Sequence, residues 1–186
     1  MMSNLSLFAM VVIIVGTLGC ATLSEKECLQ GDWKSIGYQD GTRGHLLNRF
    51  EQHREACADL NISPDFEAYK IGHQEGLTVY CEAGKGFELG EQVKDYNGVC
   101  PNHLEAAFLE QYMRGLETTH RFVLQDIKAE ENELYYKERL LINIENQEER
   151  NKIKEELKTL NSKINSLNVK HRDIIRRLEK ARAMKR

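Results

Sequence analysis

IGYQDG at residues 36–41 and IGHQEG at residues 71–76 share the pattern I-G-x-Q-[DE]-G and form an internal repeat in the first hundred residues. The two copies lie 35 residues apart, and each follows an aromatic residue, Trp33 or Tyr69. A glycine inside a helix costs about 1 kcal/mol relative to alanine. We therefore expect these glycines to let a backbone or an aromatic ring pack closely on a bare helix face. A ligand contact is the alternative use.

The residues around these stretches predict further helices. Ser63-Pro64 offers an N-cap followed by proline at the first helical position, and predicts a helix toward Cys81. Pro101 likewise predicts a helix after it. Residues 45–60 carry apolar side chains at helical spacing, whereas residues 83–98 are glycine-rich and predict a loop with a short helical piece. The predicted fold class is all-α.

Composition divides the chain near residue 118. All 13 glycines and both prolines lie at or before Gly115, and all five cysteines lie within the first 100 residues. Residues 20–118 carry 9 Lys/Arg and 17 Asp/Glu, whereas residues 119–186 carry 17 and 12. Opposite charges predict two units, a small cysteine-containing helical module over residues 28–118 and a long helical or coiled-coil tail over residues 119–186.

The N-terminus predicts export. LFAMVVIIV at residues 7–15 is apolar but too short to span a bilayer, and it precedes GTLGC at residues 16–20. Small residues before a cysteine resemble the lipobox of bacterial lipoproteins. The resemblance implies a signal peptide over residues 1–19, a palmitate-bearing lipid anchor on Cys20, and a lipidated N-terminus with linker over residues 20–27. By the same resemblance, Ala21 favours the outer membrane. An ordinary cleaved signal with an incidental cysteine is the alternative.

Four cysteines remain in the predicted mature chain. In an exported protein an even number of cysteines predicts disulfide bonds, and four cysteines permit three pairings. We favour Cys28–Cys57 and Cys81–Cys100, because each closes a short local loop. Zinc binding is the alternative, but the sequence has neither a CxxC pair nor two histidines four residues apart on one helical face. We expect no metal and no cofactor.

An ordered set of motifs identifies a family resemblance. The set runs DWKSIGYQDG, a helix ending in Cys57, AYKIGHQEGLTVYC, GKGFELG, YNGVCP and QYMRG. It resembles the bacterial lipoprotein family catalogued as domain-of-unknown-function family 2799, over about residues 28–117. The resemblance implies a protein of the cell envelope and supplies no activity.

The tail carries a heptad repeat with apolar or neutral side chains at alternating steps of four and three. Its positions are Ile153, Leu157, Leu160, Ile164, Leu167, His171, Ile174, Leu178 and Ala181, after an earlier seam at Ile127, Leu134, Leu141 and Ile144. The polar segment ENQEERNK at residues 145–152 separates the seams and marks a stutter or the turn of a hairpin. Residues 119–150 have net charge −3 and residues 151–186 have +8, which favours a hairpin. The tail has no glycine or proline to break a helix, however, and for this reason we expect one long helix.

No catalytic residue is expected, because the sequence has neither a G-x-S-x-G nor an H-E-x-x-H motif. Asp40 and Glu75 occupy equivalent motif positions, and an enzyme would need these two carboxylates to meet. A second hypothesis is a module that binds a small ligand or a glycan. Its candidate contacts are Trp33, Tyr38, Tyr69 and Tyr80.

The hypothesis we favour is a structural or protein-interaction lipoprotein of the outer membrane that faces the periplasm. Membrane lipid is the expected partner of the acylated Cys20. The basic end, HRDIIRRLEKARAMKR at residues 171–186, suits an envelope protein or peptidoglycan, and export excludes nucleic acid.

Overall fold

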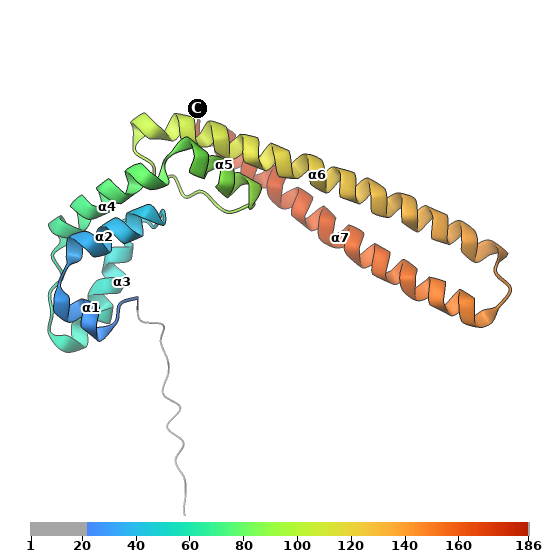
Figure 1. Cartoon of the computed structure of the whole chain (residues 1–186), viewed down its shortest axis with the longest axis horizontal. Helices are drawn as coiled ribbons and strands as arrows, with labels where there is room; N and C mark the ends of the chain where they lie inside the picture. Colours follow the sequence, from blue (N-terminus) through green and yellow to red (C-terminus); the bar gives the residue numbers. More distant parts are fainter. Residues whose placement is uncertain (1–21, 186) are drawn as a thin grey trace, which may run out of the picture.

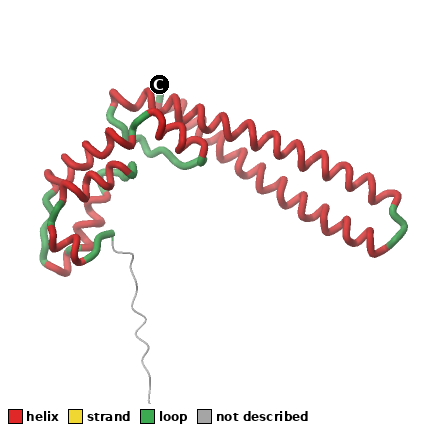
Figure 2. Tube along the Cα trace, in the orientation of Figure 1, coloured by secondary structure: helices red, strands yellow, loops and turns green. Residues whose placement is uncertain are grey.

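The computed structural model describes residues 22–185, which are helical with no strand in that range (Figure 2). The all-α fold, with a disulfide-stapled module and a long helical tail, is confirmed. No helix between residues 22 and 185 is both long enough and apolar enough to cross a bilayer. The elements are α1 (Glu25–Gln30), α2 (Trp33–Thr42), α3 (Arg49–Ala56), η1 (Ala58–Leu60), α4 (Phe66–Tyr80), α5 (Ala83–Glu91), α6 (Asn102–Asn143) and α7 (Gln147–Met184).

Local side-chain caps decide where several helices begin. Asp65 caps α4 by accepting a hydrogen bond from the Ala68 amide at 3.0 Å, so this helix begins two residues after the proline predicted to open it. Pro101 directly precedes α6, as predicted. Residues 45–60 form α3 and η1 instead of one helix, and the glycine-rich stretch forms α5 followed by a loop.

Helices α2 and α4 run parallel and touch through their glycines. A methyl group added at Gly37 would lie 2.0 Å from the Tyr69 carbonyl oxygen, and one added at Gly72 would lie 1.9 Å from that of Lys34. The second glycine of each motif meets the partner one turn later. Such proximity brings Cα–H groups to opposing carbonyls, as in small-residue helix pairs of membrane proteins. Close packing, the predicted use of the glycines, is therefore present.

Helices α5 and α6 repeat this arrangement. An added methyl group at Gly90 would meet the carbonyl of Tyr112, and one at Gly115 would meet the carbonyl of Phe87. These contacts correspond to those of the first pair. Adding 49 to a residue number in α2 gives the equivalent residue in α5, and adding 39 to a residue number in α4 gives the equivalent residue in α6. The module thus consists of two related halves, each a parallel helix pair crossed at glycines.

The equivalence extends into the turn after the first helix of each half. Gly44 and Val93 both have positive φ, 71° and 54°. The next carbonyl accepts a 2.7 Å hydrogen bond from the second helix in both halves, from His73 Nε2 to the carbonyl of residue 45 and from Tyr112 Oη to that of residue 94. The turns therefore use the same geometry with different donors.

The tail is an antiparallel hairpin, so the expectation of one long helix is wrong (Figure 1). Helix α6 runs unbroken through residue 118 to Asn143, and α7 returns along it. Cross-helix ion pairs join the acidic and basic segments, for example Lys163 Nζ to Glu130 Oε1 at 2.5 Å. The predicted heptad faces the partner helix, with Ile174 and Leu178 buried.

Side-chain caps make the turn without glycine or proline. Asn146 Oδ1 accepts hydrogen bonds from the amides of Glu148 and Glu149 at 2.9 and 3.1 Å, which starts α7. Arg150 Nη1 donates to the carbonyls of Leu141 and Ile144 at 2.8 and 2.9 Å, which satisfies the end of α6. Of the two alternatives for the polar segment at residues 145–152, the hairpin turn is correct, and α7 begins within the segment at Gln147.

The end of α7 is fixed to the module. Arg177 Nε donates to the Val93 carbonyl at 2.9 Å, and Lys180 Nζ donates to the Tyr96 carbonyl at 3.0 Å. The chain ends beside the start of α6, while the hairpin turn points away from the module (Figure 1). The hairpin is consequently a projection that is hydrogen bonded to the module at its base.

Candidate functional site

Two disulfide bonds form in the predicted pairs, Cys28–Cys57 and Cys81–Cys100. Each joins the segment before the first helix of one half to the segment before its second helix. The lipidation candidate Cys20 lies outside the described residues. Both bonds restrain the unfolded chain and thereby stabilise the module.

The four aromatic candidates do not line one hollow. Trp33 and Tyr69 are buried in the core of the first half, and Tyr80 stacks on Phe108 in the second core with ring centroids 5.5 Å apart. Only Tyr38 is exposed, at 42 %. The space between the glycine faces, where a ligand would have to lie, is filled by the opposing backbone.

Asp40 and Glu75 are separated despite their equivalent motif positions. Glu75 is exposed and pairs with Lys34 at 2.8 Å. Asp40 is buried and accepts hydrogen bonds from His53 Nε2 at 2.6 Å and from the Tyr69 hydroxyl at 2.8 Å. The two carboxylates therefore do not form the pair that acid–base catalysis would need.

A chain of hydrogen bonds extends from Asp40 to the start of the described chain. His53 Nδ1 lies 2.8 Å from Thr22 Oγ1, so the imidazole bridges Asp40 and Thr22. Arg49 Nε lies 3.2 Å from the other carboxylate oxygen of Asp40. We call Thr22, His53, Asp40 and Tyr69 the buried polar network.

The network keeps Asp40 ionised. Burial acts to raise the pKa of Asp40, but the hydrogen bonds from His53 and Tyr69 outweigh it and hold the pKa below its usual value. Burial, reinforced by the hydrogen bond to Asp40, raises the pKa of the Tyr69 hydroxyl. The arrangement is an anion with fixed donors, enclosed by the protein.

The second half builds the same scaffold without this network. Leu89 occupies the position of Asp40, and Phe108 occupies the position of Tyr69. The acceptor and its hydroxyl donor are thus both replaced by apolar side chains. The network is therefore not required for crossing the helices, and its purpose is specific to the first half.

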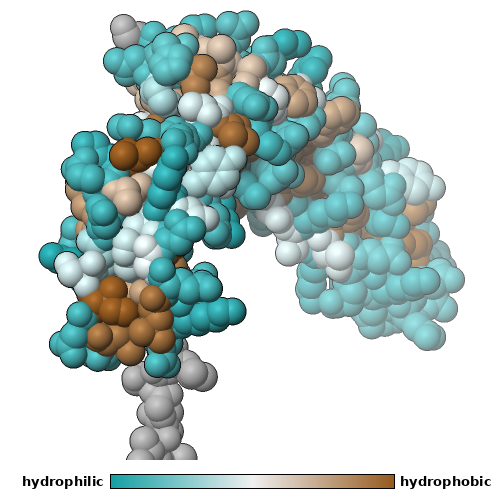
Figure 3. Space-filling view, turned by 60° about the vertical axis from the view of Figure 1, so that its left-hand side comes forward, coloured by the Kyte–Doolittle hydropathy of each residue, from teal (hydrophilic) through white to brown (hydrophobic). Residues whose placement is uncertain are grey.

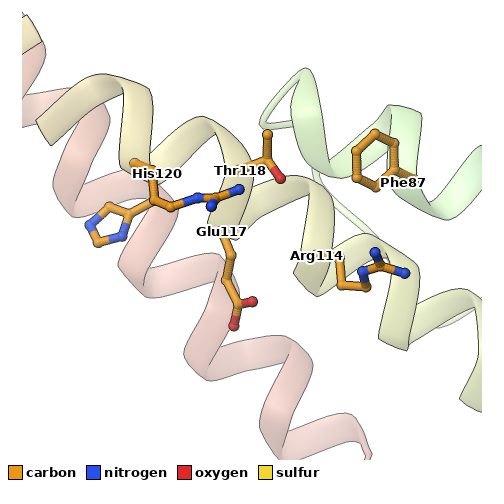
Figure 4. A pocket seen from close by; sticks show the side chains of 6 residues that line it. Phe87, Arg114, Glu117, Thr118 and His120 are labelled. Carbon is orange, nitrogen blue, oxygen red and sulfur yellow. The ribbon is translucent and has the colours of Figure 1, made fainter. Parts of the chain in front are cut away.

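A hollow of about 530 Å³ lies between α5 and α6 in the second half (Figure 4). It is lined by Phe87, Arg114, Glu117, Thr118, His120 and Arg121. Glu117 turns toward α7, where its carboxylate lies 3.7 Å from Arg182. Arg114 contacts Gln111, and neither it nor Arg121 has an ion pair within residues 22–185. The hollow thus carries two arginines that pair with no carboxylate among the described residues, since its one lining carboxylate, Glu117, lies toward Arg182, and the two arginines suit an anionic group.

His120 points from this hollow toward α7 and stacks on His171, with ring centroids 4.8 Å apart. Burial, with a contribution from the nearby His171, lowers the pKa of His120. Its Nε2 is buried without a hydrogen-bond partner. Between residues 22 and 185 no group of three or more His, Cys, Asp or Glu side chains is placed to hold a metal ion.

Sequence reasoning identified the disulfide and glycine positions but missed the network and the arginine hollow. Thr22 and His53 lie 31 residues apart, and neither stands in a recognisable motif. For the hollow, the spacing of Arg114, Thr118 and Arg121 on one helical face was an available signal.

Comparison with known proteins supplies a family and no activity. No curated protein and no solved structure matches the chain. Residues 32–117, which span both glycine-crossed helix pairs, match the family model described as "Protein of unknown function (DUF2799)". The module of this chain therefore belongs to the DUF2799 family.

Proposed function

We propose that this chain is a non-catalytic lipoprotein of the outer membrane, anchored through an acylated Cys20, that presents its hairpin to a protein partner in the periplasm. The observation that carries the proposal is the hairpin itself, which is fixed at its base and free at its turn. The disulfide bonds support an exported location, because such bonds persist in oxidising compartments.

A fixed hairpin suits recognition because little conformational entropy is lost when a rigid surface binds. Helix α6 has 42 residues and is about 60 Å long at 1.5 Å per residue. Its outer half exposes Tyr135, Tyr136 and Ile142 at 61, 58 and 78 %. Exposed tyrosines of this kind are enriched at protein interfaces. We therefore assign the partner contact to this part of α6.

The base of the hairpin adds an electrostatic contact. Arg177 and Lys180 are occupied by the module, but Arg114 and Arg121 are available in the hollow. A partner with acidic side chains complements these two guanidinium groups, which bind carboxylates in fixed geometry. The partner we propose is therefore an acidic periplasmic protein that lies along α6.

The test is photo-crosslinking in intact cells, with a photoreactive amino acid at position 135 or 142 of the full chain. Position 84 is the control, because Gly84 is exposed on α5 with open space around it. We expect one discrete crosslinked protein from both hairpin positions, less of it in an Arg114→Glu/Arg121→Glu variant, and none from position 84. Equal capture from all three positions would refute the interaction role. Absence of labelled palmitate, or its persistence in Cys20→Ala, would refute the anchor.

A further inference from the structure

Thr22, the first residue that the structure describes, contacts the first half of the module. The Thr22 hydroxyl is hydrogen bonded to His53, and Leu23 is buried with 8 % of its surface exposed. Ser24 forms a capping box with Glu27 and starts α1. Residues 22–27, predicted as part of a linker, are therefore attached to the first half.

The buried polar network accounts for this attachment. The two ring nitrogens of His53 contact both ends of this link, since Nε2 lies 2.6 Å from Asp40 Oδ2 and Nδ1 lies 2.8 Å from Thr22 Oγ1. Asp40 is held in turn by the hydroxyl of Tyr69 on α4. The hydrogen-bonded chain thus connects the first described residue to the centre of the helix pair.

Comparison of the two halves of the module indicates what the buried polar network does. The second half, which has Leu89 and Phe108 at the equivalent positions, has no N-terminal segment to hold. Its helices cross in the same way without any buried carboxylate. The polar network is therefore placed where the predicted anchor joins the fold.

The distance available to the anchor is short. Thr22 lies two residues after Cys20, and two extended residues span about 7 Å. At the same end of the module, α1 exposes Leu29 at 65 %. Figure 3 shows an apolar patch at the lower left end of the molecule, in the first half of the module. Helix α1 itself carries two glutamates and one lysine, so its charge is nearly balanced.

We propose that the module lies directly on the lipid bilayer, with α1 and Leu29 in contact with lipid, and that the buried polar network holds Thr22 so that the anchor cannot lift the module away. This inference rests on the proposed acylation of Cys20. The apolar end that carries Leu29 faces lipid, because a cysteine anchored two residues before Thr22 leaves no room for another protein between the module and the bilayer. The near-balanced charge of α1 suits a zwitterionic surface.

The experiment uses full-length acylated protein reconstituted in phosphatidylcholine vesicles, with a photoreactive amino acid at position 29. Position 142 is the control, because Ile142 is equally apolar and 78 % exposed but lies near the hairpin turn. We expect several-fold more lipid adduct from position 29 than from position 142. Equal yields from the two positions would overturn the proposal.

Two variants test the role of the short connection. Six Gly/Ser residues inserted between Ala21 and Thr22 leave every described contact in place, and we expect them to reduce the adduct at position 29 several-fold. We expect Thr22→Val, which removes the hydroxyl, to reduce the adduct at position 29 as well, but by less. An unchanged adduct after the insertion would overturn the proposal. Failure of the anchor is distinguishable, because unacylated protein would not incorporate labelled palmitate in the first place.

Discussion

Replacing Gly72 by alanine tests whether backbone contact holds the first half together. The added methyl group would lie 1.9 Å from the Lys34 carbonyl oxygen and 2.8 Å from the carbonyl carbon, where almost no real contact is shorter than 3.0 Å. Both atoms belong to the backbone of α2, so relief requires the helices to separate by more than an ångström. Overpacking of this kind costs about 3 kcal/mol, and the better helix propensity of alanine returns about 1 kcal/mol. We therefore expect a net loss of about 2 kcal/mol.

The assay is denaturant unfolding of the oxidised mature protein, followed by circular dichroism and extrapolated linearly. Gly84→Ala is the matched control, because it makes the same chemical change in α5 where nothing lies within 4 Å of the new methyl group. We expect this control to be unchanged or more stable by up to about 1 kcal/mol. The backbone-contact argument is refuted if Gly72→Ala unfolds at the same denaturant concentration as Gly84→Ala.

Three further predictions concern the hairpin and the second half. Arg150→Ala leaves two carbonyls at the end of α6 without their donor, and we expect a loss of about 1 kcal/mol with fraying near the turn, measured by amide hydrogen exchange; unchanged exchange there would contradict this role. Because burial lowers the pKa of His120 from 6.5, the unfolded chain takes up its proton first, so stability falls as the pH drops below about 6.5. We expect His120→Phe to have a flatter dependence of Tm on pH between 8 and 5, and identical slopes would show that another group is responsible. Replacing Cys81 and Cys100 by serine opens a loop of 19 residues and is expected to cost about 3 kcal/mol in thermal unfolding, so an unchanged Tm would mean that the bond does not constrain the unfolded chain.

The hairpin was only partly predictable from the sequence. The heptad positions and the opposite charges of the two segments pointed to an antiparallel pair, and both features are present at the α6–α7 contact. The absence of glycine and proline favoured a continuous helix, and this criterion failed. Asn146 starts α7 and Arg150 satisfies the end of α6, both through side-chain hydrogen bonds, so the turn needs neither glycine nor proline. Asn146, with Glu148 and Glu149 in the first turn after it, was the available N-cap signal.

The glycine motifs were predictable in kind, because glycines inside helices call for a close neighbour, but the identity of that neighbour depended on the tertiary fold. The same limit applies to the motif carboxylates. Asp40 and Glu75 occupy the same motif position, yet one is buried by α3 and the other pairs with Lys34 on the surface. No local pattern distinguishes them, because α3 covers only one face of the helix pair.

Comparison of the two halves separates what the scaffold needs from what each half does. Glycines remain at three of the four crossing positions, as Gly86, Gly90 and Gly115, and Gln111 stands where the first half has Gly72. Asp40 and Tyr69 are replaced together by Leu89 and Phe108. The carboxylate and the hydroxyl have to be replaced together, because a buried hydroxyl left without its acceptor costs about 1–3 kcal/mol of stability.

The exposed positions also diverge between the halves. Glu75 in the first half corresponds to Arg114 in the second, where an ion pair gives way to a hollow with two unpaired arginines. The first half therefore devotes its specific side chains to the start of the chain, and the second half devotes its own to the base of the hairpin. Under the proposed function, one copy of the repeated helix pair serves attachment to the membrane and the other serves recognition of a partner.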